Sequence, residues 1–188
     1  MKTLLFEKKG HTGIITLNRP DRLNALSHTL VRELHQLLNQ LDGDLETRVI
    51  ILTGAGRGFC AGADLKGGEG EGSWDANLGP VQSQYRLQEA YAHLVVRMRQ
   101  IPQPILAAVN GPAAGGGLCL ALASDVRYAS ESARFNCAFI KLGLSGCEMG
   151  SSYFLPRIVG ASHAAELMYT GRLIDAHTAL EIGLVSKV

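Results

Sequence analysis

The sequence contains few aromatic residues, almost no net charge and no long hydrophobic run. Phe, Tyr and Trp make up 6% of the 188 residues, and the formal net charge is +1. Without a basic stripe or an acidic tail, nucleic-acid binding has little support. The longest apolar runs, such as residues 105–109, are far too short to span a bilayer. We therefore expect a soluble globular protein with no nucleic-acid partner and no membrane partner.

Cysteines and histidines are present, but their spacing does not indicate a metal site or a disulfide framework. The six histidines are scattered, and no two cysteines form a CxxC pair. The N-terminus, MKTLLFEKKG, lacks the long apolar region and the cleavage site of a signal peptide. We expect no bound metal, reduced cysteines and a cytoplasmic location. The four cysteines are Cys60, Cys119, Cys137 and Cys147.

The first half of the chain shows an alternation of strand and helix patterns. Apolar runs on both sides of Lys9–His11 predict a hairpin of two strands. Leucines at helical spacing predict a helix that follows Ser27, a plausible N-cap. The run VIIL at residues 49–52 is typical of a strand buried on both faces. A long helix is predicted from about Val81 to Gln100.

The second half continues the alternation. Residues 105–109 form a second buried strand pattern, a helix is predicted from about Gly116, and residues 125–130 form a short strand. Two or three short helices follow, and GLVSKV at residues 183–188 predicts a last strand. No internal repeat or linker divides the chain. We therefore predict one α/β domain, residues 1–188, with largely parallel strands.

Two segments run from a buried strand through small residues to a predicted helix start: VIILTGAGRGFCAGADL and ILAAVNGPAAGGGLCLA. The first N–H groups of a helix lack an intrahelical partner and can bind an anion or a developing oxyanion. If the two turns face each other, one N–H from each could hold a single carbonyl oxygen. Each turn could instead be only a tight connection, with GGG allowing close helix–strand packing. A phosphate loop is less favoured because no GxxxxGK[ST] motif is present.

Four motifs carry a resemblance to a known family. NRPDRLNAL (18–26), FCAGADL (59–65), NGPAAGGGLCLALASD (110–125) and the segment 155–188 are similar to the enoyl-CoA hydratase/isomerase, or crotonase, superfamily. The resemblance covers nearly the whole chain and implies a crotonase-like spiral of ββα units in an α/β fold. It also implies an enzyme that acts on acyl-CoA thioesters, with coenzyme A as part of the substrate and no permanently bound cofactor.

The resemblance assigns roles to residues of the two turns. The backbone N–H groups of Ala63 and Gly116 would hold the thioester oxygen and stabilise an enolate. The loop that contains Ala61 and Leu65 would cradle the adenine. Arg22 and Lys66 are candidates for the CoA phosphates, although either could be a solvated surface charge. We also place Asp64 in this cofactor-binding loop, where it more plausibly ties down the loop through Asx-type hydrogen bonds.

The sequence departs from the family at the acid–base residues. Family hydratases use two glutamates, and the corresponding positions here are Cys119 and Phe139. Neither a thiol nor a phenyl ring can do paired carboxylate work, so a hydratase that uses both glutamates is disfavoured. Cys119 as a nucleophile is a weak alternative because buried cysteines are usually inert.

Glu148 is a different candidate carboxylate. It lies in a Gly/Ser-rich, otherwise uncharged stretch, near the place where related isomerases carry an acid. It could shuttle a proton at the acyl chain, or it could cap a helix that begins near Gly150. We leave both interpretations open. Residues 67–84 predict a mobile flap whose Trp74 and Tyr85 touch the acyl group, or equally a disordered surface insertion.

The favoured hypothesis is enoyl- or dienoyl-CoA double-bond isomerisation with Glu148 as the single carboxylate. The alternatives are a hydratase-type lyase with non-standard acid and base residues, and a non-catalytic acyl-CoA-binding protein. Family members continue beyond GLVSKV into a helical segment, which is apparently absent here. The family expectation for assembly is a homotrimer or a dimer of trimers.

Overall fold

The N-terminal segment forms the hairpin and the helix that the sequence predicts. A computed structural model describes residues 1–66 and 74–188 of the chain. Strand β1 (Leu4–Lys9) pairs antiparallel with β2 (Thr12–Leu17). Helix α1 (His28–Asp42) begins after Ser27, whose hydroxyl accepts a hydrogen bond from the Leu30 N–H at 3.2 Å. The predicted N-cap is therefore confirmed.

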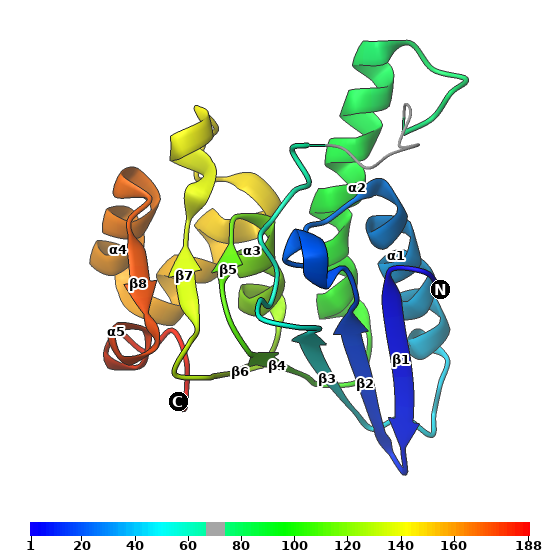
Figure 1. Ribbon diagram of the computed structural model, residues 1–188, viewed down its shortest axis with the longest axis horizontal. Coiled ribbons are helices and arrows are strands. Elements are labelled where there is room, and N and C mark those ends of the chain that lie inside the picture. The colour runs from blue at the N-terminus through cyan, green and yellow to red at the C-terminus, as the bar shows by residue number, and fades with distance from the viewer. Residues whose placement is uncertain (67–73) are drawn as a thin grey trace.

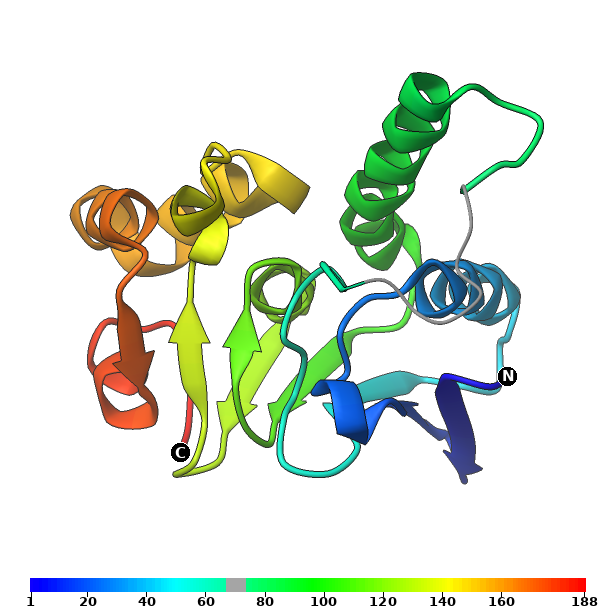
Figure 2. The ribbon, with the colours of Figure 1, turned by 45° about the horizontal axis from the view of Figure 1, so that its top comes forward.

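A five-stranded sheet in the order β1-β2-β3-β4-β6 forms the floor of the molecule. Strands β3 (Val49–Gly54), β4 (Ile105–Val109) and β6 (Val126–Ala129) continue it in parallel from β2. In β3 and β4 fully buried side chains alternate with half-buried ones. The prediction that β3 is buried on both faces is therefore wrong. Figure 2 shows that the helices that follow β2, β3 and β4 cover one face of the sheet only.

A second, smaller sheet gives the fold its spiral. It has the order β5-β7-β8, with β5 (Ala113–Ala114), β7 (Arg134–Asn136) and β8 (Leu173–Asp175). Single bridges, Leu26 to Ala63 and Cys60 to Ala113, extend the same arrangement toward the N-terminus. Successive ββα units thus contribute to both sheets, as the resemblance implies, and Figure 1 shows the two layers side by side.

Helices α2 (Pro80–Gln100) and α3 (Gly116–Ala123) follow β3 and β5, as predicted. The α3 helix is buried along its whole length, so its ends are fixed by the surrounding layers. One hydrophobic cluster joins α1, α2 and α3 to the covered face of the larger sheet. Among the residues described, no helix is long and apolar enough to cross a membrane.

The C-terminal third differs most from the predicted pattern. Two short 3-10 helices, η2 (Ala138–Leu142) and η3 (Glu148–Gly150), precede α4 (Ser151–Thr170) and α5 (Ala176–Glu181). Helix α4 is interrupted at Gly160, which has φ 79° and ψ 161°. The strand predicted for residues 183–188 does not form in full. Only Lys187 makes a bridge, to Tyr128 of β6, so that prediction is wrong.

Candidate active site

The turns that follow β3 and β4 lie against each other. Cys60 and Ala113 form a parallel bridge, and the Ala114 N–H donates to the Cys60 carbonyl at 3.0 Å. A methyl group placed on Gly62 would lie 3.3 Å from the Gly116 nitrogen. The two segments that the sequence analysis paired are therefore neighbours in space.

Each turn presents one unused backbone N–H. The bridge to Leu26 uses the residues on both sides of Ala63: the Leu26 N–H donates to Gly62 O at 2.8 Å, and the Asp64 N–H donates to Leu26 O at 3.1 Å. The Ala63 N–H is thereby directed away from Leu26. Gly116 is the first residue of α3, where an N–H has no intrahelical acceptor. Within the described parts of the chain, neither N–H donates to a protein acceptor.

At Gly115 and Gly117 of the glycine triplet, the backbone geometry requires a glycine. Gly115 has φ 50° and ψ −121°, which a residue with a Cβ rarely adopts. A Cβ on Gly117 would lie 2.0 Å from the Cys60 carbonyl oxygen. Gly117 is therefore explained by its close packing, and Gly115 by its positive φ. Together these two glycines place Gly116 at the start of α3, opposite the first turn.

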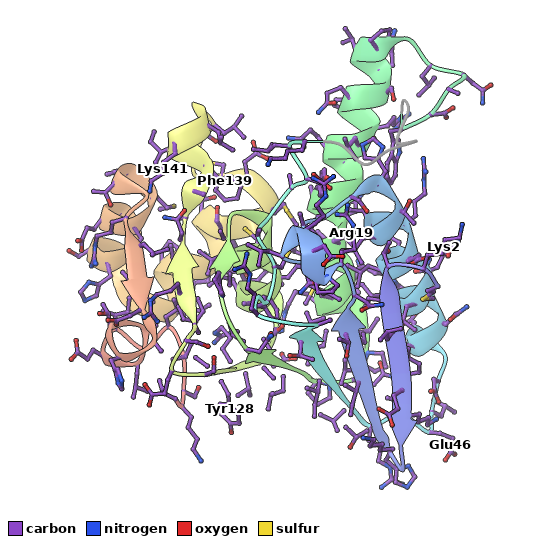
Figure 3. The ribbon with its side chains drawn as sticks, in the orientation of Figure 1. Lys2, Arg19, Glu46, Tyr128, Phe139 and Lys141 are labelled. Atoms are coloured by element: carbon purple, nitrogen blue, oxygen red, sulfur yellow. The ribbon has the colours of Figure 1, made fainter. Side chains whose placement is uncertain are left out.

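A pocket of about 230 Å³ opens at the meeting point of the turns. Ala63 and Gly116 both line it, and its walls come from the first turn, α2, η2 and η3. Glu148 is the one carboxylate that lines it among residues 1–66 and 74–188. The larger apolar side chains at the wall are Leu65, Phe139, Leu142, Leu144 and Met149. Figure 3 shows Phe139 where β7 runs into η2.

Glu148 is held at the pocket wall by neighbours on three elements. Gln88 of α2 donates to its carboxylate at 3.4 Å. Its main-chain carbonyl accepts from the Ser151 hydroxyl at 3.0 Å and from the Cys119 thiol at 3.6 Å. Helix α4 begins after Gly150, and no side chain of the described residues caps that helix. The carboxylate therefore faces Gln88 and the pocket instead of the α4 N-terminus.

Cys119 lies behind the pocket wall and is not exposed. Burial raises the pKa of its thiol well above the usual range, and the neighbouring thiols and Glu148 raise it further. A protonated, inaccessible thiol is a poor nucleophile. Its contact with the Glu148 carbonyl makes Cys119 a support for the segment that carries the carboxylate.

The residues predicted to hold CoA separate into three groups. Ala61 and Leu65 line the pocket. Arg22 and Lys66 are exposed and lie outside its lining. Asp64 is paired with Arg19 at 2.7 Å, and only 5% of its side chain is exposed. Its other oxygen accepts from the Lys66 N–H at 3.3 Å, which is the predicted Asx-type bond.

Arg19 and Asn24 hold the first turn in place, and the sequence analysis named neither as a functional residue. Asn24 is fully buried and has φ 56°. Its amide donates to Ala55 O at 2.9 Å and to Gly58 O at 2.8 Å, while its carbonyl accepts from the Arg19 N–H at 2.8 Å. The motif NRPDRLNAL was the available signal, because both residues belong to it.

Two opposing effects act on the pKa of the Asp64 carboxylate. Burial raises its pKa, but the hydrogen bond and the charge of Arg19, the Lys66 N–H and the charge of Arg22 together lower it below its usual value. The carboxylate therefore stays ionised and fixes the segment directly after Ala63. Figure 3 shows Arg19 just beyond the end of β2.

Among the described residues of the predicted flap, 74–84, none lines this pocket. Residues 67–73 lie outside the described residues. Trp74 packs edge-on against His28, with ring centroids 5.6 Å apart, and under the Arg32 guanidinium. Trp74 and Tyr85 are not among the pocket-lining residues, and Tyr85 is exposed. Their predicted contact with the acyl group is therefore not supported by this placement.

The described residues contain no group of three or more His, Cys, Asp and Glu side chains that could hold a metal ion. Besides its apolar wall, the pocket offers the backbone N–H groups of Ala63 and Gly116, the Glu148 carboxylate, and the polar side chains of Gln88, Tyr91 and Lys141.

Comparison with known proteins gives consistent results. A sequence model of the enoyl-CoA hydratase/isomerase family matches residues 7–188. A Mycobacterium leprae protein named as a probable enoyl-CoA hydratase is 49% identical over 174 residues, which are 93% of this chain and 59% of that protein. The 1,2-epoxyphenylacetyl-CoA isomerase of Escherichia coli is 40% identical over 178 residues, 93% of this chain and 64% of that protein.

A solved structure extends the likeness to the fold. The crystal structure of a probable enoyl-CoA hydratase/isomerase from Mycobacterium abscessus superposes with a TM-score of 0.89 at 39% identity. The superposition covers 100% of this chain and 69% of that one. The chain thus spans about three fifths of the length of the curated relatives named above.

Proposed function

Because the chain belongs to the enoyl-CoA hydratase/isomerase family, we propose that the pocket binds an acyl-CoA thioester and shifts a double bond in its acyl chain. The observation that carries this proposal is the pairing of two free N–H groups, at Ala63 and Gly116, with one pocket carboxylate, Glu148. Isomerisation needs a single group that removes a proton and returns it.

In this proposal the thioester oxygen accepts hydrogen bonds from both N–H groups. Glu148 takes a proton from the acyl carbon next to the double bond, and the electron pair forms a dienolate whose negative oxygen the two donors stabilise. Glu148 then returns the proton to the carbon at the far end of the dienolate. The positive end of the α3 dipole lies at Gly116 and adds to the stabilisation.

The apolar wall and the loop after Ala63 have separate roles in this proposal. Phe139 and Met149 exclude water from the dienolate, which strengthens the electrostatic contribution of the two N–H groups. Ala61 and Leu65 contact the CoA portion of the substrate. Arg22 and Lys66 lie outside the pocket lining but are exposed, and they are proposed to meet the CoA phosphates.

A hydratase-type reaction is the second candidate, since a relative carries that name. Adding water needs a group that activates the water and a group that protonates the acyl carbon. Glu148 is the one pocket carboxylate of the described residues, and the family resemblance matches Cys119 and Phe139 to the positions of the two hydratase glutamates. The paired requirement therefore favours isomerisation over hydration.

The test is turnover of 2-enoyl-, 3-enoyl- and dienoyl-CoA thioesters by the unmodified protein and by Glu148→Gln, with Glu181→Gln as a control at an exposed position. We expect Glu148→Gln to lower isomer formation by about 10²–10⁴-fold, the usual contribution of a general base, with acyl-CoA affinity unchanged.

Unchanged turnover in Glu148→Gln would remove the assigned base. Hydration without isomer formation would favour the second candidate. Acyl-CoA binding without turnover would indicate a non-catalytic family member, and no binding at all would refute the proposed use of the pocket.

A further inference from the structure

A second pocket, of about 280 Å³, lies at the other end of α3. Three arginines line it, each from a different element: Arg99 from α2, Arg127 from β6 and Arg157 from α4. It shares no lining residue with the candidate active site. The eight residues of α3 place the two pockets about 12 Å apart along the helix axis.

Arg127 is the most constrained of the three. Its neighbour Tyr128 points away from the helices in Figure 3, so strand alternation puts Arg127 on the helix-covered side. Its guanidinium donates to Leu184 O at 2.8 Å and to Ser124 O at 2.7 Å. Burial lowers the pKa of this guanidinium, the nearby Asp125 raises it, and Arg99 lowers it again. No carboxylate of the described residues lies within ion-pair distance of Arg127.

The acidic residue that lines this pocket, Asp125, already has a hydrogen-bond donor at each carboxylate oxygen. One Asp125 oxygen accepts from Arg99 at 2.5 Å, and the other accepts from the Ile105 N–H at 2.8 Å. Asp125 therefore neutralises Arg99. Arg157 makes no ion pair within the described chain, and its guanidinium lies 3.8 Å from the centre of the Tyr153 ring. Within residues 1–66 and 74–188, two of the three positive charges thus have no carboxylate at ion-pair distance.

The carbonyls at the C-terminal end of α3 bind only some of the guanidinium N–H groups in this pocket. The carbonyls of Ala123 and Ser124 accept one N–H each from Arg99 and Arg127, which suits the negative end of the helix dipole. A guanidinium has five N–H donors, so donors of Arg127 and Arg157 stay available. Their fork geometry matches the oxygens of a phosphate group.

We propose that this pocket binds a phosphate-bearing small molecule, with Arg127 and Arg157 holding the phosphate. A phosphate monoester carries close to two negative charges at neutral pH, which equals the two unpaired guanidinium charges. The pocket is separate from the candidate active site, so the inference is independent of the proposed function.

The test is isothermal titration calorimetry of pyrophosphate into the protein and into Arg157→Gln, with Arg172→Gln as the control. Arg157 is the residue to change because its one side-chain hydrogen bond is to Tyr153 of its own helix, so its loss should leave the fold intact. Arg172 is partly exposed and pairs with Glu166, away from this pocket. We expect pyrophosphate to bind the protein and Arg172→Gln equally, and Arg157→Gln about tenfold more weakly or worse.

Two further arms locate the bound anion. Citrate, a carboxylate ligand of similar charge, is expected to bind at least tenfold more weakly than pyrophosphate. Lys66→Gln should keep the component of pyrophosphate binding that Arg157→Gln loses, since Lys66 belongs to the loop proposed to meet the CoA phosphates at the other pocket. The proposal is overturned if pyrophosphate does not bind, if Arg157→Gln binds it as well as the unmodified protein, or if Lys66→Gln alone abolishes binding.

Discussion

The turn after β3 and the turn after β4 each present one free N–H, but they are held by different means. Side chains from a distant segment fix the first turn: Asn24 bonds two of its carbonyls, and Arg19 pairs with Asp64. The second turn bonds the first through the Asn110 side chain, but at Gly117 it packs directly on the Cys60 carbonyl and leaves no room for a side chain. We therefore expect the removal of a side chain that holds the first turn to lower stability moderately, and the addition of a side chain at Gly117 to lower it strongly.

The largest effect is expected from Gly117→Ala. Its Cβ would lie 2.0 Å from the Cys60 oxygen and 2.8 Å from the Cys60 Cβ, so the two turns must separate. We expect a loss of about 3 kcal/mol or more in the free energy of unfolding. Denaturant unfolding measures it, with Gly43→Ala as the control because a Cβ there meets nothing within 4 Å. A stable Gly117→Ala protein with full acyl-CoA affinity would contradict the close approach of the turns.

A smaller loss is expected from Asn24→Ala. The change removes the donor to the Ala55 carbonyl, leaves the Gly58 carbonyl with only the longer 3.4 Å bond from Asn110, and puts alanine at φ 56°. We expect a loss of about 2–3 kcal/mol in the free energy of unfolding. Asn77→Ala, in an exposed loop, should change it little. Equal melting temperatures for the two variants would show that Asn24 does not fix the first turn.

The smallest and most pH-dependent effect is expected from Asp64→Asn. Folding lowers the pKa of Asp64, so its contribution to stability is fully present above the unfolded pKa of about 3.9 and is lost as pH falls through the lower folded value. We expect Asp64→Asn to cost about 1–2 kcal/mol at pH 7, and the difference from the unmodified protein to shrink below about pH 4. Unfolding curves across pH, with the exposed Asp21→Asn as reference, check this. A difference that does not vary with pH would refute the ion-pair account.

Local sequence patterns predicted the elements that carry a periodic or continuous apolar run. The leucines after Ser27 mark one face of α1, and the β-branched run at residues 49–52 marks β3. Strand β7 has only three residues and β8 another three, too few to show a period. The run GLVSKV has strand composition, but only Lys187 finds a partner strand. Whether each of these three segments forms a strand depends on pairing with residues that are distant in the sequence.

The site was predictable where the chemistry lies in the backbone pattern. The strand-to-glycine pattern marked the two turns, the family resemblance pointed to Ala63 and Gly116 within them, and the uncharged stretch around Glu148 marked a carboxylate that lines the pocket. The bonds of Asn24 to Gly58 and of Arg19 to Asp64 join residues 34 and 45 positions apart, and no local pattern reports such bonds. The position of Trp74 against α1 was missed for the same reason.

The central claim is that the two turns together hold one thioester oxygen. The most direct test is a crystal structure of the protein with a non-reactive acyl-CoA analogue. The account predicts that the thioester oxygen lies about 2.7–3.1 Å from the nitrogens of both Ala63 and Gly116, with the Glu148 carboxylate beside the acyl chain. A thioester oxygen bound outside this pocket, or in contact with only one of the two nitrogens, would contradict it.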